Sequence, residues 1–149
     1  MLTGFQHLHS ALRWVVLFLL VWTLIQSRIG KSKGNAFSAK QAKLGLFTMI
    51  SLHVQLLLGL ALYVGKGWSS MLGDSTIMGN AVRFFVVEHL LGMLIAIVLG
   101  TLGHSLVKRA TDDGTKYKRQ FLFFGLALVI IIASIPWPFR PGFQNYGWF

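Results

Sequence analysis

Four long runs of apolar residues, separated by short polar stretches, form the main pattern of this chain. The runs cover about 9–26, 44–64, 81–107 and 117–135. Each is close to the roughly 20 residues that an α-helix needs to cross about 30 Å of hydrocarbon. Apolar residues occur all around each expected helix, as they do where lipid replaces water outside a bundle. The pattern therefore predicts an all-α fold, an integral membrane up-down bundle of four helices that forms a single domain over residues 1–149.

The stretches between the runs contain residues that end helices. Ser, Gly and Lys are frequent in 27–43, and Asp112 and Asp113 precede the last run. After the last run, proline at positions 136, 138 and 141 stops the helix, because proline lacks an N–H donor and clashes with the preceding turn. The first run has no Lys/Arg-led start and no signal-peptidase-like site, so we expect it to be retained as a membrane helix.

Charge and cysteine content exclude several classes of protein. Charged residues make up 12% of the chain, about half the usual fraction in soluble domains. The formal net charge is +10, but the bases lie in two short connections, so they flank a membrane and we expect no nucleic-acid partner. The chain has no cysteine, which excludes disulfides, thiolate metal sites, iron–sulfur clusters and c-type haem attachment.

The placement of the bases also predicts the orientation of the helices. The first and third connections hold ten of them: Arg28, Lys31, Lys33, Lys40, Lys43, Lys108, Arg109, Lys116, Lys118 and Arg119. By the positive-inside rule both connections lie in the cytoplasm. We therefore expect a multi-pass membrane protein with both termini on the outer side.

Ionisable residues inside the apolar runs need a reason, since burying them in hydrocarbon is costly. Those within or beside the runs are His9, Arg13, His53, Arg83, Glu88, His89 and His104. Two of them are expected at similar depth. His53 lies twelve positions before Gly65, and His89 lies eight positions after Ala81. At 1.5 Å per residue these positions are roughly 18 Å and 12 Å below the outer end of neighbouring helices.

Two histidines at matched depth on neighbouring helices suit axial ligation of one haem iron, so His53 and His89 are the predicted metal ligands. A flat ring also needs space beside the ligands. Gly92, followed by Ala96, Gly100 and Gly103, presents small residues on one face of the third helix. Such a stripe fits either a porphyrin or the close packing of a neighbouring helix.

The propionates of a haem favour arginine, whose planar fork binds carboxylates. Arg13 and Arg83 are both expected about one turn from the outer interface, where contact with lipid phosphates is the alternative. His9 is four positions before Arg13, so both share a face, and His9 is expected to contact a propionate or a quinone carbonyl. Glu88 is expected in an ion pair with one of the arginines, with proton transfer as the alternative. His104 is expected near the cytoplasmic interface.

Short motifs extend this interpretation: HLHS at 7–10, HVQLLLG at 53–59, VEH at 87–89 and IPWP at 135–138. With these motifs the chain resembles small four-helix bacterial membrane proteins labelled cytochrome b or cytochrome b-like, and the resemblance covers nearly the whole chain. It implies a haem b held by paired histidines, one-electron transfer and a place in the bacterial inner membrane, with both termini on the periplasmic side. The assignment of His53 and His89 as the pair comes from their depth and not from the family.

The sequence therefore predicts a membrane electron carrier with one haem b, acting as a subunit of a larger inner-membrane complex rather than as an independent enzyme. Its electron donor and acceptor would be quinol, another haem or a partner subunit. Two alternatives stay open. One is a cofactor-free structural or accessory subunit, in which the histidines only join helices. The other is an enzyme for a lipid-soluble substrate, with Glu88 and His9 as proton carriers in a lateral opening.

Overall fold

A computed structural model describes residues 2–77 and 81–144, and every regular element within these ranges is helical. The elements in order are α1 (Leu2–Ser32), α2 (Ala39–Gly65), η1 (Trp68–Met71), η2 (Ser75–Ile77), α3 (Ala81–Arg83), η3 (Phe84–His89), α4 (Leu90–Lys108) and α5 (Asp113–Ser134). Four stretches are long and apolar enough to cross a membrane: α1, α2, the continuous α3–η3–α4 segment and α5. The predicted all-α membrane bundle is therefore confirmed.

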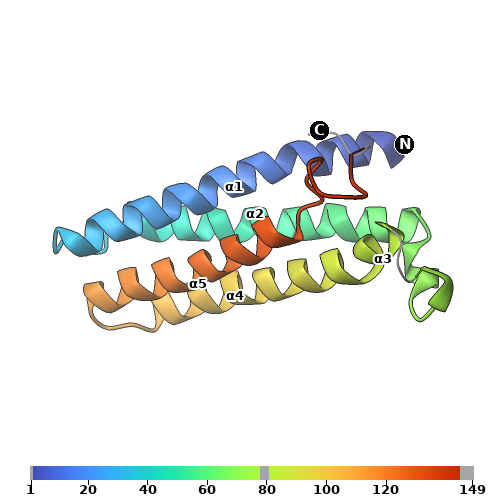
Figure 1. Cartoon of the computed structure of the whole chain (residues 1–149). Coiled ribbons are helices and arrows are strands. Elements are labelled where there is room, and N and C mark those ends of the chain that lie inside the picture. Colours follow the sequence, from blue (N-terminus) through green and yellow to red (C-terminus); the bar gives the residue numbers. More distant parts are fainter. Residues whose placement is uncertain (1, 78–80, 145–149) are drawn as a thin grey trace.

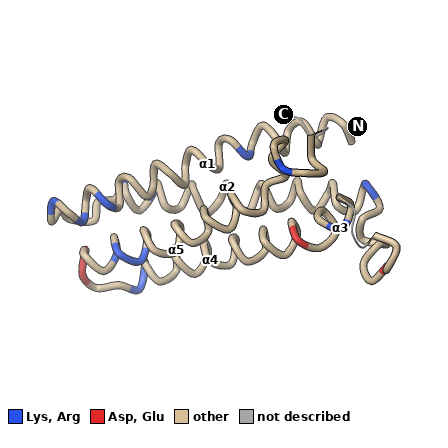
Figure 2. Tube along the Cα trace, viewed as in Figure 1, with Lys and Arg blue, Asp and Glu red and all other residues tan. Residues whose placement is uncertain are grey.

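The four long helices form an antiparallel bundle (Figure 1). Neighbours along the chain pack together, and α5 closes the ring by packing on α1. The start of α1, the α2–α3 connection and the segment after α5 lie at one end, which we call the terminal end (Figure 1). The two short loops lie at the other end, where Lys and Arg gather, and we call it the basic end (Figure 2). That the basic end faces the cytoplasm stays a prediction.

The helices extend beyond the expected spans, because helix ends are set by capping residues and not by the thickness of the lipid. α2 begins after Ser38, whose side chain accepts a hydrogen bond from the Gln41 N–H at 3.3 Å. α5 begins after Asp112, whose carboxylate accepts from the Thr115 N–H at 2.8 Å. Hydrogen bonds from Thr115 hold the pKa of Asp112 below its ordinary value. α1 is followed by Gly34, which takes a positive φ of 62° that favours glycine.

The third span is not the uninterrupted α-helix that its sequence predicts. Phe84–His89 forms a π-helix, η3, between the single turn of α3 and the long α4. A π-helix bonds each N–H to the carbonyl five residues earlier, and such turns often mark functional sites. The carbonyl of Val86 in this element accepts a hydrogen bond from the Tyr63 hydroxyl of α2 at 3.0 Å. Tyr63 therefore ties the irregular turn to the neighbouring helix.

Candidate functional site

A cavity of about 290 Å³ lies between the helices in the terminal half of the bundle. All four long helices contribute to its walls, which are mainly apolar: Val16 on α1, Leu52, Leu56 and Leu62 on α2, Met93, Ala96 and Ile97 on α4, and Ile131 and Ile135 on or just after α5. The polar residues of the lining are Gln6, His9, Ser10, Arg13, Gln55, Tyr63, Lys66 and His89. An apolar cavity with a few polar groups is the usual form of a small-molecule site, and this volume lies at the lower end of the range for such sites.

His89 enters the cavity from the last position of the π-helix. Its Nδ1 lies 2.7 Å from the carbonyl oxygen of Ser134, the last residue of α5. A carbonyl can only accept, so Nδ1 must carry the proton and donate it. In a neutral imidazole the lone pair is then on Nε2. The end of α5 thus fixes both the tautomer and the direction of the His89 ring.

His9 faces His89 across the terminal half. The centres of the two rings are 6.4 Å apart, and their planes make an angle of 70°. Gly59 on α2 makes room for the His9 ring, because a Cβ atom at position 59 would lie only 3.1 Å from its Cε1 atom. Gln55, one turn earlier on α2, donates from Nε2 to the His9 carbonyl at 2.9 Å and lies 3.3 Å from the ring Nε2. α2 therefore holds both the backbone and the ring of His9.

Two buried polar atoms beside the cavity make no hydrogen bond within the described part of the chain. They are Nδ1 of His9 and Oε1 of Gln55. Folded proteins satisfy nearly all buried polar atoms, so an orphaned atom needs an explanation. Two such atoms at one cavity indicate a place that takes a polar or coordinating occupant rather than one filled by packing alone.

Two cationic side chains line the same cavity. Arg13 lies one helical turn after His9, as the spacing predicts, and stacks against the Trp14 ring at 5.3 Å. Lys66, just after α2, donates to the Gln6 side chain at 2.7 Å and lies 5.1 Å from the centre of the Trp68 ring. Together they place positive charge beside the two imidazoles.

His53 does not lie beside His89, so the pairing expected from their depth is wrong. Nδ1 of His53 bonds to the Met49 carbonyl at 2.8 Å, and Nε2 lies 3.5 Å from the hydroxyl of Thr101. Thr101 follows His89 by twelve residues, which is about 18 Å along a helix. The depth estimate took Gly65 and Ala81 as level, whereas the contact of Tyr63 with Val86 shifts the register of the two helices. In this structure the two imidazoles therefore lie too far apart to share one iron.

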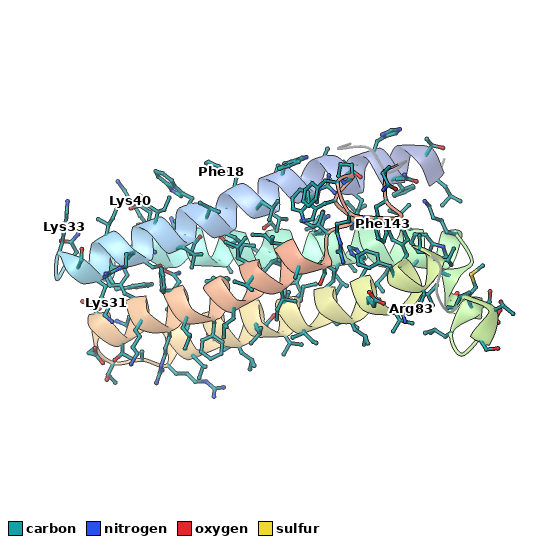
Figure 3. All side chains as sticks on the ribbon, in the orientation of Figure 1. Phe18, Lys31, Lys33, Lys40, Arg83 and Phe143 are labelled. Atoms are coloured by element: carbon teal, nitrogen blue, oxygen red, sulfur yellow. The ribbon has the colours of Figure 1, made fainter. Side chains whose placement is uncertain are left out.

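Arg83 and Glu88 form an ion pair at 2.5 Å, with both side chains 43% exposed. The structural pair predicted for Glu88 is confirmed. The pair lies at a separate hollow of about 230 Å³, together with Phe84, Arg140 and Phe143. Figure 3 labels Arg83 and Phe143. Arg83 is therefore not at the cavity where its expected propionate contact would lie. Glu88 and His9 line different hollows, so the lateral opening required for a pair of proton carriers does not form in the described residues.

The stripe of small residues on α4 serves mainly as a packing face. A Cβ atom at Gly92 would overlap the Ser134 side chain, and one at Gly103 would come within 2.5 Å of Phe123 Cβ, both on α5. Of the stripe, Ala96 alone reaches the cavity lining. The packing alternative thus accounts for Gly92, which we had expected beside a porphyrin. His104 lies farther along α4, four positions before its end at Lys108 near the basic end.

Five polar residues of the cavity lining are not among the candidates from the sequence: Gln6, Ser10, Gln55, Tyr63 and Lys66. The candidates were ionisable groups within or beside the spans, although the uncharged amide of Gln55 in the apolar run LHVQLLLGL is an equally clear signal. Comparisons with protein-family models, with curated proteins and with solved structures give no match.

Proposed function

We propose that this chain is a membrane-embedded electron-transfer protein that binds one b-type haem, which His9 and His89 would hold. The observation that carries the proposal is the 6.4 Å between the centres of their rings. An imidazole nitrogen ligates a metal ion at about 2.0–2.1 Å, so two imidazoles on opposite sides of one ion have their ring centres about 6 Å apart. The 6.4 Å between the two rings is compatible with one shared iron, and it also lies within the range of an ordinary edge-to-face ring contact.

The hydrogen bond of His89 supports the same role. Histidines that bind metals almost always donate their other ring N–H to a carbonyl or carboxylate, which fixes the tautomer and makes the ligating nitrogen more basic. His89 makes such a bond to Ser134 at 2.7 Å. His53 also donates from Nδ1 to a carbonyl, but its Nε2 faces Thr101 and lies outside the cavity lining.

The remaining groups of the cavity suit a porphyrin. Its walls are apolar, and Arg13 and Lys66 offer positive charge for acidic substituents. A haem held by two imidazoles supplies reversible one-electron transfer and has no open iron position for a substrate. The protein's own part is to exclude water with Val16, Leu52 and Ile97, and to fix the two imidazoles from α2 and α5.

The surroundings favour a role inside a larger membrane assembly. Large apolar side chains cover the outside of the bundle, among them Phe18, Leu57 and Val129, and the loops are short. Little polar surface is left for a soluble electron partner. We therefore propose an inner-membrane subunit that exchanges electrons with quinol or with a partner subunit.

An absorbance spectrum of the purified protein tests the proposal. The chain is produced in a haem-sufficient membrane host, purified in detergent, and recorded as reduced minus oxidised. Two imidazole ligands predict a sharp α band at about one haem per chain and no spectral change with carbon monoxide, since no iron position is open. A protein that folds but shows no band would contradict the proposal and favour the cofactor-free accessory subunit.

A further inference from the structure

Lys66 is a base at the end of the bundle that the positive-inside pattern otherwise leaves poor in bases (Figure 2). Lysine in such a position needs a specific reason. Two other bases at this end have structural roles. Arg83 pairs with Glu88, and Arg140 donates to the carbonyls of Ala133 and Ile135 at the end of α5, at 3.1 and 3.3 Å. These contacts explain why both arginines lie at this end, and no bound ligand is needed to explain them.

The recorded contacts of Lys66 are of a different kind. Its ammonium bonds to the neutral amide of Gln6 and lies over the neutral ring of Trp68, and within the described ranges no carboxylate lies within ion-pair distance. Gln6, Trp68 and Lys66 all line the cavity. These contacts hold the ammonium at the cavity wall and leave its charge without a counter-ion from residues 2–77 and 81–144.

An ammonium held by neutral groups beside a mainly apolar cavity favours an occupant that carries negative charge at that end. Lys66 is half-buried and its hydrogen bond to Gln6 is exposed, so water screens the attraction only in part. The hydrogen bond to Gln6 reduces the rotamer freedom that a lysine loses when it binds an anion. The site is thus arranged for a carboxylate at the end of an apolar molecule.

We propose that Lys66, positioned by Gln6 and Trp68, binds a carboxylate of the molecule that occupies the cavity. The inference rests on the proposed function, in which that molecule is haem b and the carboxylate is a propionate. Lys66 then takes the place that sequence reasoning gave to Arg83. It is a binding residue and not an iron ligand, so its removal should leave the spectrum unchanged and weaken retention.

The test compares haem with its dimethyl ester, in which both carboxylates are neutral. Apoprotein in detergent is titrated with each ligand, and the dissociation constants are measured by absorbance for the wild type, K66Q, K66R and K33Q. Lys33 lies at the basic end, far from the cavity, and serves as the matched control (Figure 3). We expect K66Q to weaken haem binding about fivefold and ester binding by less than about twofold, while K66R and K33Q stay near wild type.

Each other result overturns the inference in a recognisable way. Equal losses for haem and ester in K66Q would show that Lys66 only shapes the wall of the cavity. Unchanged binding of both ligands would show that Lys66 does not bind a carboxylate of the occupant. If the wild type binds neither ligand, the proposed function fails first, and the inference fails with it.

Discussion

The two halves of this bundle use buried polar residues in opposite ways. In the basic half, five such side chains form hydrogen bonds with each other or with the backbone: Thr23, Ser27, Gln41, Thr48 and Gln120. In the terminal half, His9 and Gln55 leave buried atoms without a hydrogen bond in the described ranges, and both line a cavity. The same four helices thus contain two groups of buried polar residues. The side chains of the first group form hydrogen bonds that join the helices. The second group includes atoms without a hydrogen-bond partner in the described ranges, and these indicate a site.

The geometry of the basic half shows what a purely structural cluster looks like in this protein. Oε1 of Gln120 accepts from Gln41 Nε2 at 2.5 Å and from the Ser27 hydroxyl at 2.8 Å. The hydroxyls of Thr23 and Thr48 lie 2.8 Å apart. These bonds connect α1, α2 and α5 through side chains that are buried within the bundle. Breaking this network should therefore affect folding and leave the cavity intact.

Gln120→Leu tests this directly and should have the largest effect on stability. It removes the acceptor shared by Ser27 and Gln41. The Ser27 hydroxyl can still donate to the Thr23 carbonyl at 2.7 Å, but the buried Gln41 amide keeps only its 3.2 Å bond to Ser27. We expect a loss of about 2–3 kcal/mol in the free energy of unfolding in detergent, with an unchanged haem spectrum in the protein that stays folded. An unchanged stability would show that the network is not structural.

Gly92→Ala should have the next largest effect, because the new methyl group would overlap the Ser134 side chain. Overpacking of this kind costs about 1–3 kcal/mol. The matched control is Gly125→Ala on α5, where a Cβ atom would meet only Leu24, at an ordinary 3.7 Å. That variant should gain up to about 1 kcal/mol from helix propensity. Equal melting temperatures for the two variants would contradict the close packing of α4 on α5.

Gln55→Leu should change the site more than the fold. The variant loses a hydrogen bond worth about 1 kcal/mol and also removes an orphaned oxygen, so its stability should change by less than about 1 kcal/mol. Because the His9 ring loses a contact that orients it, we expect a shift in the midpoint potential and in the low-spin electron paramagnetic resonance signal. Gln120→Leu, whose hydrogen bonds lie in the basic half outside the cavity lining, should leave the resonance signal unchanged. Identical signals for both variants would refute a role in positioning His9.

Arg83→Gln should have the smallest effect. Both partners of its ion pair with Glu88 are 43% exposed, and such pairs contribute about 0.2–1 kcal/mol. Haem content and spectrum should match the wild type. A loss of haem in this variant would support the contact between Arg83 and a propionate that the sequence predicts. It would contradict the proposal that Lys66 binds that propionate.

Sequence reasoning recovered the spans because apolar runs and capping residues are local signals. It also placed His9 and Arg13 on one face, since a spacing of four residues is fixed by helix geometry. It failed for His53 with His89 because the relative depth of two helices depends on the register between them, and a contact such as Tyr63 with Val86 is not local. The π-helix that carries His89 into the cavity could not be predicted either. Its sequence FFVVEH has the composition of an ordinary membrane helix, so it contains no local signal for the irregular turn.

The central claim is that His9 and His89, and not His53, hold the cofactor. The haem-to-protein ratio after purification, measured in H9A, H89A, H53A and H104A at matched expression, tests it most directly. We predict that H9A and H89A lose the haem, while H53A and H104A retain about one haem per chain with the wild-type spectrum. Loss of haem in H53A together with full retention in H9A would contradict the account.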